Sequence, residues 1–198
     1  MPEVGGAMNT LSYGLLALLS VKPRTGYELM QQIQPLWRAK HSQIYPLLAK
    51  LEQLGCVRFV QVTQKEKPDK KIYSITETGL AKLRSWLPEQ ADEPVKRDEL
   101  LLKAYCLSLA EPRQARHLIA ERRALFQNHL AKYNAQLAEL KRETGLSDGE
   151  PGLRSPYFGN YILIKRAIAG AQLELEWCSW VMHILDEEQG QCAERPEP

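Results

Sequence analysis

Lysine side chains gather in one short stretch of the chain, between two segments that alternate like β-strands. They are Lys65, Lys67, Lys70 and Lys71. Pro68 and Asp69 lie among them and favour a turn, so the stretch is predicted to form the tip of a β-hairpin. Lysines at a hairpin tip can reach phosphate oxygens, which indicates binding to a polyanion. The alternative is that the hairpin packs elsewhere and its lysines are only solvated.

A second group of polar side chains belongs to a helix predicted over residues 42–54, with Ser42 as its N-cap. One face of this helix is apolar, formed by Ile44, Leu47, Leu48, Leu51 and Leu54. Gln43, Tyr45 and Lys50 are left for the other faces. A helix with a buried stripe and a polar outer face suits a DNA major groove, where its N-terminal residues can reach base edges.

Catalytic and metal-binding chemistry is not indicated. The chain has no local Ser/His/Asp motif and no glycine-rich phosphate loop. Its four histidines, His41, His117, His129 and His183, are far apart, and Cys178 stands five residues from His183, which is poor spacing for one helical face. We therefore predict no enzyme activity, no metal and no cofactor.

The cysteines and the apolar segments indicate a cellular location. The four cysteines are widely spaced and include no CxxC pair, as expected for reduced thiols in the cytoplasm. The apolar run 11–21 is far shorter than the roughly 20 residues of a membrane span. We expect a cytoplasmic protein with no membrane association.

The elements that would position the polar groups follow a winged helix-turn-helix plan. Helices are predicted from Leu11, after a cap at Thr25, over 42–54 and after a cap at Thr76, with the two-stranded hairpin before the last. We assign residues 8–88 to this domain, with Met8 as an alternative start. From the pattern alone it binds DNA or, as the alternative, another protein.

The second half of the chain is predicted to be helical and to dimerise. An acidic linker, 88–94, precedes a short helix over 96–109 and two long helices, 112–143 and 157–187, joined by a Gly/Pro/Ser loop. Apolar residues in the long helices recur by threes and fours, which is typical of coiled-coil packing. The residues expected at the dimer interface are Ile119, Phe126, Tyr133, Tyr161, Ile164, Ile168, Leu175, Trp177, Cys178, Met182 and Leu185. We assign 89–188 to a helical dimerisation domain and 189–198 to a disordered tail.

Charge separates the two halves. Up to Pro88 the chain has 12 lysines and arginines against 6 acids, and after it 14 against 18. A basic first half followed by an acidic second half indicates that only the first half meets a polyanion.

Four stretches of the chain carry a resemblance to a known family. The first joins LSYGLLALLS to TGYELMQQI, the second is WRAKHSQIYPLLAKLEQLGCV and the third is KKIYSITETGLAKLRSWL. The fourth comprises RDELLLKAYCL, ERRALFQNHLAKYNAQL and YILIKRAIAGAQLELEWCSWVMHIL. Together they resemble the PadR family of bacterial transcriptional regulators, in the longer-tailed subgroup that includes the virulence activator AphA. The resemblance extends from about Leu11 to Leu185.

The resemblance implies a mainly α-helical protein with an N-terminal winged helix, a two-stranded wing and a C-terminal long-helix dimerisation domain. It also implies a homodimer that binds a pseudo-palindromic double-stranded DNA operator, usually as a repressor; an activator is the alternative. Ser42, Gln43 and Tyr45 would face the groove and Lys50 and the wing lysines the phosphates, with Thr25, Tyr27, His41 and Pro46 completing the DNA-binding set. Some relatives respond to a small-molecule effector, but no residue here selects one.

Two aromatic positions keep alternative interpretations. Tyr45 either contacts DNA or packs between helices, whereas Tyr27 is expected in the core with its hydroxyl near phosphate. Trp177 and Trp180 could stack on a planar effector near a dimer cleft, but packing in the dimer core is the favoured interpretation.

Overall fold

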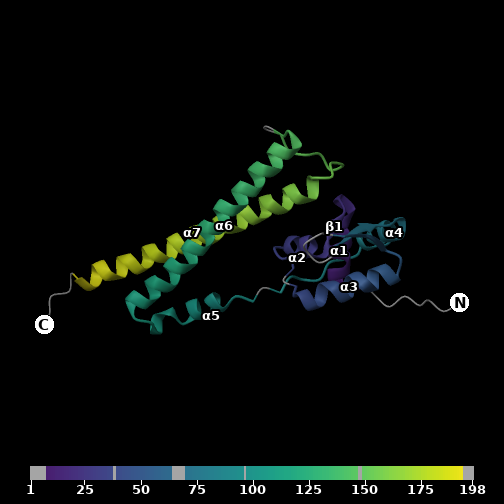
Figure 1. Cartoon of the computed structure of the whole chain (residues 1–198). Helices are drawn as coiled ribbons and strands as arrows, with labels where there is room; N and C mark the ends of the chain where they lie inside the picture. Colours follow the sequence, from purple (N-terminus) through teal and green to yellow (C-terminus); the bar gives the residue numbers. More distant parts are fainter. Residues whose placement is uncertain (1–7, 38, 64–69, 96, 147–148, 194–198) are drawn as a thin grey trace. The chain divides into compact units, whose positions relative to one another are not determined.

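The computed structural model describes residues 8–37, 39–63, 70–95, 97–146 and 149–193 of the 198-residue chain. The chain divides into two compact units, Met1–Glu93 and Pro94–Pro198. Helices dominate both units, and the only sheet in the described part of the chain belongs to the first (Figure 1). This is the mainly α-helical architecture that the sequence predicts.

The first unit is a winged helix-turn-helix. Its elements are α1 (Thr10–Val21), β1 (Arg24–Thr25), α2 (Gly26–Ile33), α3 (His41–Gln53), β2 (Val57–Val62), β3 (Lys70–Ile75) and α4 (Glu77–Trp86). Leucine and isoleucine side chains from the first three helices form its core, and Leu15, Leu16, Leu29, Ile44 and Leu48 are fully buried there. Burial of this apolar surface fixes α3 on the other helices and leaves its polar face outside.

Side-chain caps set the starts of three of these helices. Asn9, Thr25 and Thr76 accept hydrogen bonds from backbone amides in the first turns of α1, α2 and α4. The expected N-cap at Ser42 is wrong, because α3 begins at His41 and its N-cap residue is Lys40. The Gln43 side chain accepts a hydrogen bond from the Lys40 amide (2.9 Å), which stabilises the earlier start.

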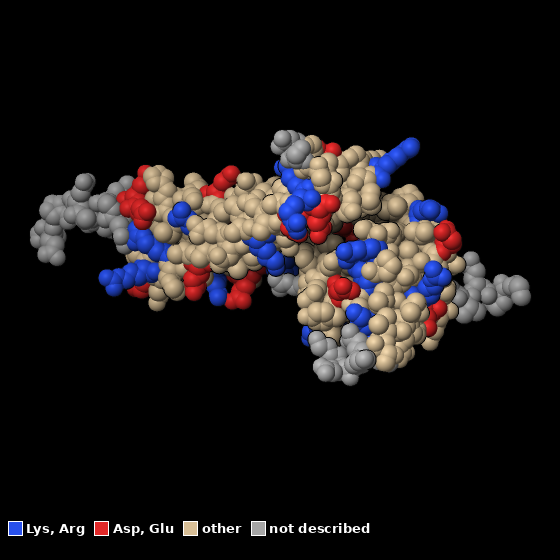
Figure 2. Space-filling model, turned by 45° about the horizontal axis from the view of Figure 1, so that its top comes forward, with Lys and Arg blue, Asp and Glu red and all other residues tan. Residues whose placement is uncertain are grey.

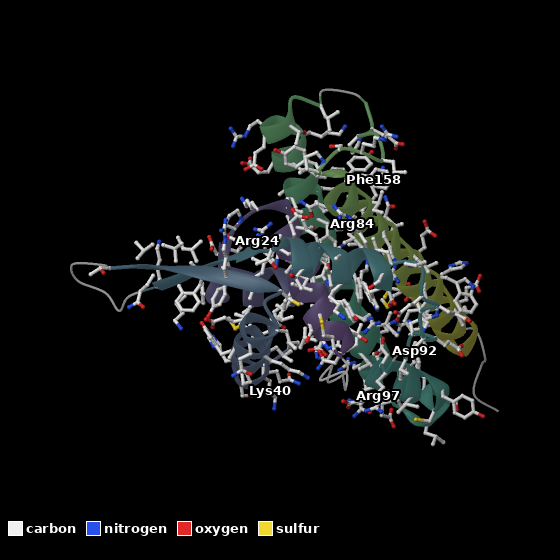
Figure 3. The ribbon with its side chains drawn as sticks, turned by 90° about the vertical axis from the view of Figure 1, so that its right-hand side faces the viewer. Arg24, Lys40, Arg84, Asp92, Arg97 and Phe158 are labelled. Carbon is white, nitrogen blue, oxygen red and sulfur yellow. The ribbon has the colours of Figure 1, made fainter. Side chains whose placement is uncertain are left out.

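The wing is the antiparallel pair β2–β3, in which Val57 lies opposite Ile75 and Val62 opposite Lys70. Figure 3 shows this hairpin extending from the helices of the first unit. The structure contains one strand that the sequence did not predict. This strand, β1, lies just before α2 and pairs with β3, which gives the sheet order β1-β3-β2. Gly55 follows the C-cap of α3 with a φ of 66°, a left-handed conformation that glycine adopts readily.

The second unit consists of α5 (Glu99–Tyr105), a 3-10 turn η1 (Leu107–Leu109), α6 (Pro112–Thr144) and α7 (Phe158–Ala193). The single helix predicted over 96–109 is therefore interrupted at Cys106, and residue 96 lies outside the described residues. The predicted tail is wrong in its first half, because α7 continues to Ala193 through residues with no proline among them. Residues 194–198 lie outside the described chain.

The two long helices pack side by side along one apolar seam (Figure 1). Tyr161, Ile164 and Ile168 of α7 pack with Leu140 of α6. The residues predicted for the dimer interface lie in this region: Ile119, Tyr161, Ile164, Ile168 and Cys178 are buried within one chain, and Phe126, Tyr133, Leu175, Trp177, Met182 and Leu185 are half-buried. The heptad pattern therefore describes, in large part, packing between two helices of the same chain.

Arginines of α6 connect the helices of the second unit. Arg122 is paired with Asp98 at the start of α5 (Nη2–Oδ2 2.5 Å) and with Glu174 of α7 (Nη2–Oε2 2.8 Å). All three side chains are largely buried. Burial lowers the pKa of the Arg122 guanidinium, but the two carboxylates together raise it by more, so the net change is a rise. Nearer the end of α7, Arg116 pairs with Asp186 (2.9 Å).

Among the described residues, no helix is long and apolar enough to span a membrane. The same residues include no group of three or more His, Cys, Asp or Glu side chains arranged to hold a metal ion.

Candidate nucleic-acid interface

The outer face of α3 presents its polar side chains to solvent. Ile44, Leu48 and Leu51 are turned into the core. The predicted α3 contact residues are all exposed: His41, Ser42, Gln43, Tyr45, Pro46 and Lys50. Pro46 lies inside the helix and leaves the Ser42 carbonyl without an amide donor four residues on. The face that the sequence predicts for DNA contact is therefore accessible.

Beside α3 lies a hollow of about 770 Å³ between the start of α2 and the wing strand β3. The predicted DNA-binding residues that line it are Thr25, Tyr27, Tyr45, Lys70 and Lys71. They come from three separate parts of the chain, and only the fold brings them together. His41, Ser42, Gln43, Pro46 and Lys50 do not line the hollow, and Lys65 and Lys67 lie outside the described residues.

The sequence left two roles open for Tyr45, contact with DNA and packing between helices, and the position of its ring is compatible with both. Its ring packs against the backbone of Gly26, where an added Cβ would lie 2.8 Å from Cε1 of the ring. The ring also stacks on His41, with 5.4 Å between centroids. Nevertheless 44% of Tyr45 is exposed. The residue thus packs between helices on one side and remains available to a ligand on the other.

Tyr27 is on the surface, so its expected place in the core is wrong. It lies in the first turn of α2, on the side away from the buried Leu29 and Ile33, and 55% of it is exposed. Its hydroxyl oxygen accepts a hydrogen bond from Gln31 Nε2 (2.9 Å), which holds the ring along the outside of α2.

A capping box fixes the wall of the hollow at the start of α2. Glu28 Oε2 accepts hydrogen bonds from the Thr25 amide (2.7 Å) and hydroxyl (2.8 Å), and the Glu28 amide donates to Thr25 Oγ1. The backbone and side-chain bonds from Thr25 lower the pKa of the Glu28 carboxyl, with smaller contributions from Arg24 and Lys70. Figure 3 labels Arg24, next to this start on β1.

The lysines of β3 differ in their surroundings. Lys71 Nζ lies 3.9 Å from the centroid of the Phe59 ring on β2, a cation–π contact that directs the ammonium group. Lys70 is exposed at the end of the strand. On the face drawn in Figure 2, basic and acidic side chains are interspersed over the described surface.

Sequence reasoning missed two carboxylates in the hollow, Glu28 and Glu52. Glu28 had a detectable signal, the Thr-x-x-Glu spacing of a capping box at 25–28. Glu52 had none, because only the fold brings the end of α3 near β3. Burial raises the pKa of the Tyr73 hydroxyl in the same hollow, and Glu52 and Tyr45 add to the rise. These carboxylates restrict where a phosphate can lie.

The fold and this surface define a winged-helix protein with a long-helix C-terminal unit, and comparisons with known proteins identify its family. The model of the "Transcriptional regulator PadR-like family" matches residues 15–85, and that of "Virulence activator alpha C-term" matches residues 96–186. The Negative transcriptional regulator PadR of Bacillus subtilis is 31% identical over 189 residues, which cover 91% of this chain and 100% of that protein. This chain belongs to the PadR family, a family of transcriptional regulators and not of enzymes.

Solved structures agree with this assignment. Bacillus subtilis PadR in complex with operator DNA has a TM-score of 0.65 at 30% identity and covers 89% of this chain and 99% of its own. The same protein in complex with p-coumaric acid has a TM-score of 0.59 at 28% identity, covering 90% and 99%. The Vibrio cholerae virulence activator AphA shares the fold, with a TM-score of 0.63 at 22% identity, covering 90% and 99%.

Proposed function

We propose that this chain binds a double-stranded DNA operator as a homodimer and represses transcription. The observation that carries the proposal is the convergence of Tyr27, Tyr45 and Lys70 on one hollow beside the exposed face of α3. As the recognition helix, α3 would enter the major groove, and the wing and the start of α2 would hold the flanking sugar–phosphate backbone. Similarity to a PadR solved on operator DNA supports this assignment.

The residues divide into two expected roles. Ser42, Gln43 and Tyr45 lie in the first turns of α3, from which side chains reach base edges. Lys50 and Lys70 are exposed cations suited to phosphate. The first group should determine which sequence is bound, and the second should contribute affinity for any duplex.

A gel-shift titration with the promoter upstream of the protein's own gene, at two salt concentrations, tests both roles. Tyr45→Ala should abolish specific binding. A variant with Lys65, Lys67, Lys70 and Lys71 all changed to alanine should bind any duplex more weakly. Its affinity should also depend less on salt, because its binding releases fewer counterions from the DNA. Lys132→Ala, an exposed change on α6, is the matched control. A stable, folded dimer that binds neither this promoter nor a random duplex would contradict the proposal.

The homodimer requires apolar surface that the α6–α7 seam leaves free. Such a surface exists on α7, where Leu163, Leu173, Trp180 and Ile184 are exposed at helical spacing beside the half-buried Trp177. Because a long helix that is apolar on two sides is rarely left in water, we assign this stripe to the second copy. Dimerisation would set the two recognition helices about 34 Å apart, one turn of DNA, or at a multiple of that distance.

The proposal has two alternatives, a protein partner in place of DNA and activation in place of repression, and it includes a small-molecule effector. If the winged helix binds a protein instead, its binding should change little with salt, whereas DNA affinity should fall steeply. Repression and activation separate in a promoter–reporter assay, in which deletion of the gene should raise expression from the bound promoter. Because the Bacillus subtilis relative is solved with p-coumaric acid, we also propose a small-molecule effector for this chain.

A further inference from the structure

One face of α3 carries a carboxylate into the hollow beside the wing. Tyr45, Ala49 and Glu52 all line that hollow, and their spacing of four and three residues places them in one row along the helix. Glu52 stands in the last turn of α3, at the opposite end of the helix from Ser42 and Gln43. The row thus begins beside the side chains expected to contact bases and ends at a negative charge.

The charge of Glu52 acts on the inside of the hollow. The hydroxyl of Tyr73, a side chain that is only 6% exposed on the central strand β3, has a raised pKa. Burial is the main cause of that rise, and the nearby carboxylate of Glu52 is the second, followed by Tyr45. Glu52 is therefore directed toward β3, and its field reaches the floor of the hollow.

Four charged side chains line the hollow, and two of them already have a role in the fold. Glu28 is held in the capping box at the start of α2, and Lys71 lies over the ring of Phe59. Lys70 and Glu52 form no ion pair with another described residue. A phosphate that enters the hollow therefore meets the cation of Lys70 and the anion of Glu52 together.

Operator and non-operator duplexes place their backbones differently on such a surface. Base contacts fix the position of an operator along α3, whereas attraction between cations and phosphates supplies nearly all of non-specific binding. A duplex without base contacts is therefore free to move toward Lys70, which brings its phosphates into the hollow. There Glu52 repels them, because charges within about 10 Å of each other are little screened at about 0.1 M salt.

We propose that Glu52 is a specificity-determining residue, which weakens binding to non-operator DNA by repelling phosphates that enter the hollow. This inference rests on the proposed function, because it concerns the same surface. It assigns to the surface a residue that lowers affinity, beside those that contribute affinity. Specificity is a difference between two affinities, so a charge that disfavours the wrong duplex raises it without any new contact to the right one.

An experiment on the full-length protein compares two duplexes. Selection from a pool of random duplexes with the wild type identifies the operator. Fluorescence anisotropy then gives the affinity of wild type and Glu52→Gln for that operator and for a random duplex of equal length, at two salt concentrations. Glu77→Gln is the matched control, because this exposed carboxylate of α4 does not line the hollow and its loss changes the net charge equally.

Glu52→Gln should bind the random duplex about fivefold more tightly, the size of one exposed charge interaction, and the operator less than about twofold more tightly. The ratio of the two affinities should therefore fall, and selection with this variant should give a less defined consensus. The gain on random duplex should shrink at the higher salt concentration, because screening weakens the repulsion. Glu77→Gln should leave the ratio unchanged, and circular dichroism verifies the folding of both variants.

Two results would overturn the inference. Weaker operator binding by Glu52→Gln would show that the carboxylate accepts a hydrogen bond from a base, as from the amino group of cytosine. An unchanged ratio, or an equal change in Glu77→Gln, would show that Glu52 is only a solvated charge. A wild type that enriches no sequence would contradict the proposed function as well. A wild type that selects an operator while Glu52→Gln keeps the same ratio overturns this inference alone.

Discussion

The ring of Tyr45 on α3 lies directly against the backbone of Gly26 at the start of α2, so close that a methyl group at position 26 would meet it at 2.8 Å. A glycine that the sequence presents as part of a helix start thus determines where an exposed ring of α3 can lie. Position and orientation of this ring are coupled to a residue nineteen positions earlier in the chain.

Gly26→Ala tests that coupling. The atoms it would meet are at the far end of a side chain that can rotate outward, so the free energy of unfolding should change by less than about 1 kcal/mol. Operator affinity should nevertheless fall, because the ring leaves its position beside the groove-facing residues. In a Tyr45→Ala background the same change should have no further effect on affinity. An independent, additive loss in the double variant would show that the two residues act separately.

Arg122→Gln tests the ion pairs that join α5, α6 and α7. The change removes the guanidinium that pairs with the largely buried carboxylates of Asp98 and Glu174. Breaking such a buried network typically costs about 3 kcal/mol, which urea unfolding would measure. Arg142→Gln is the control, because its pair with Glu139 on the same helix is exposed and its loss should leave the urea midpoint unchanged. A similar shift for both variants would argue against burial as the cause.

Acid should weaken the start of α2. The folded-state pKa of Glu28 lies below its ordinary value of 4.5, because its carboxylate accepts hydrogen bonds from Thr25. The ionised form therefore stabilises the fold above pH 4.5, and this contribution disappears as the pH falls through the lower folded-state pKa. Wild type should melt above Glu28→Gln at neutral pH, and the two should converge in acid. Melting temperatures from pH 7 to pH 3 measure the difference; a constant gap would disprove the linkage.

The free stripe of α7 predicts which residues hold the dimer together. Leu173 is 66% exposed and Trp180 is 60% exposed within a single chain. Leu173→Asp and Trp180→Asp should therefore yield folded monomers in sedimentation equilibrium, because a buried carboxylate opposes association. Gln172→Asp, beside the stripe at an exposed polar position, should remain a dimer. Ile168→Asp is expected to unfold the second unit instead, since that residue is buried in the seam.

Periodicity determined most of the secondary structure, because the burial of an apolar face depends on spacing that is visible in the chain. Leu48 and Leu51 identified α3, and the alternation from Val57 onward identified the wing. Thr25 and Thr76 marked helix starts through local hydrogen bonds that need no tertiary context. Ser42 failed as a cap because Gln43, one residue later, bonded to the Lys40 amide and moved the start of the helix.

The amino-acid types by themselves also determined the candidate DNA-binding residues and the family, since both rest on local motifs such as the Gly26–Leu29 and Ile44–Leu48 segments. Tertiary structure alone decided how these residues are grouped. Only the fold brings Glu52 beside Tyr45 and Lys70 in one hollow, and pairs β1 with β3. It also assigned Tyr161, Ile164 and Ile168 to a seam within one chain. A heptad pattern states that a helix face must be covered but not what covers it, because the hydrophobic effect rewards burial against any apolar partner.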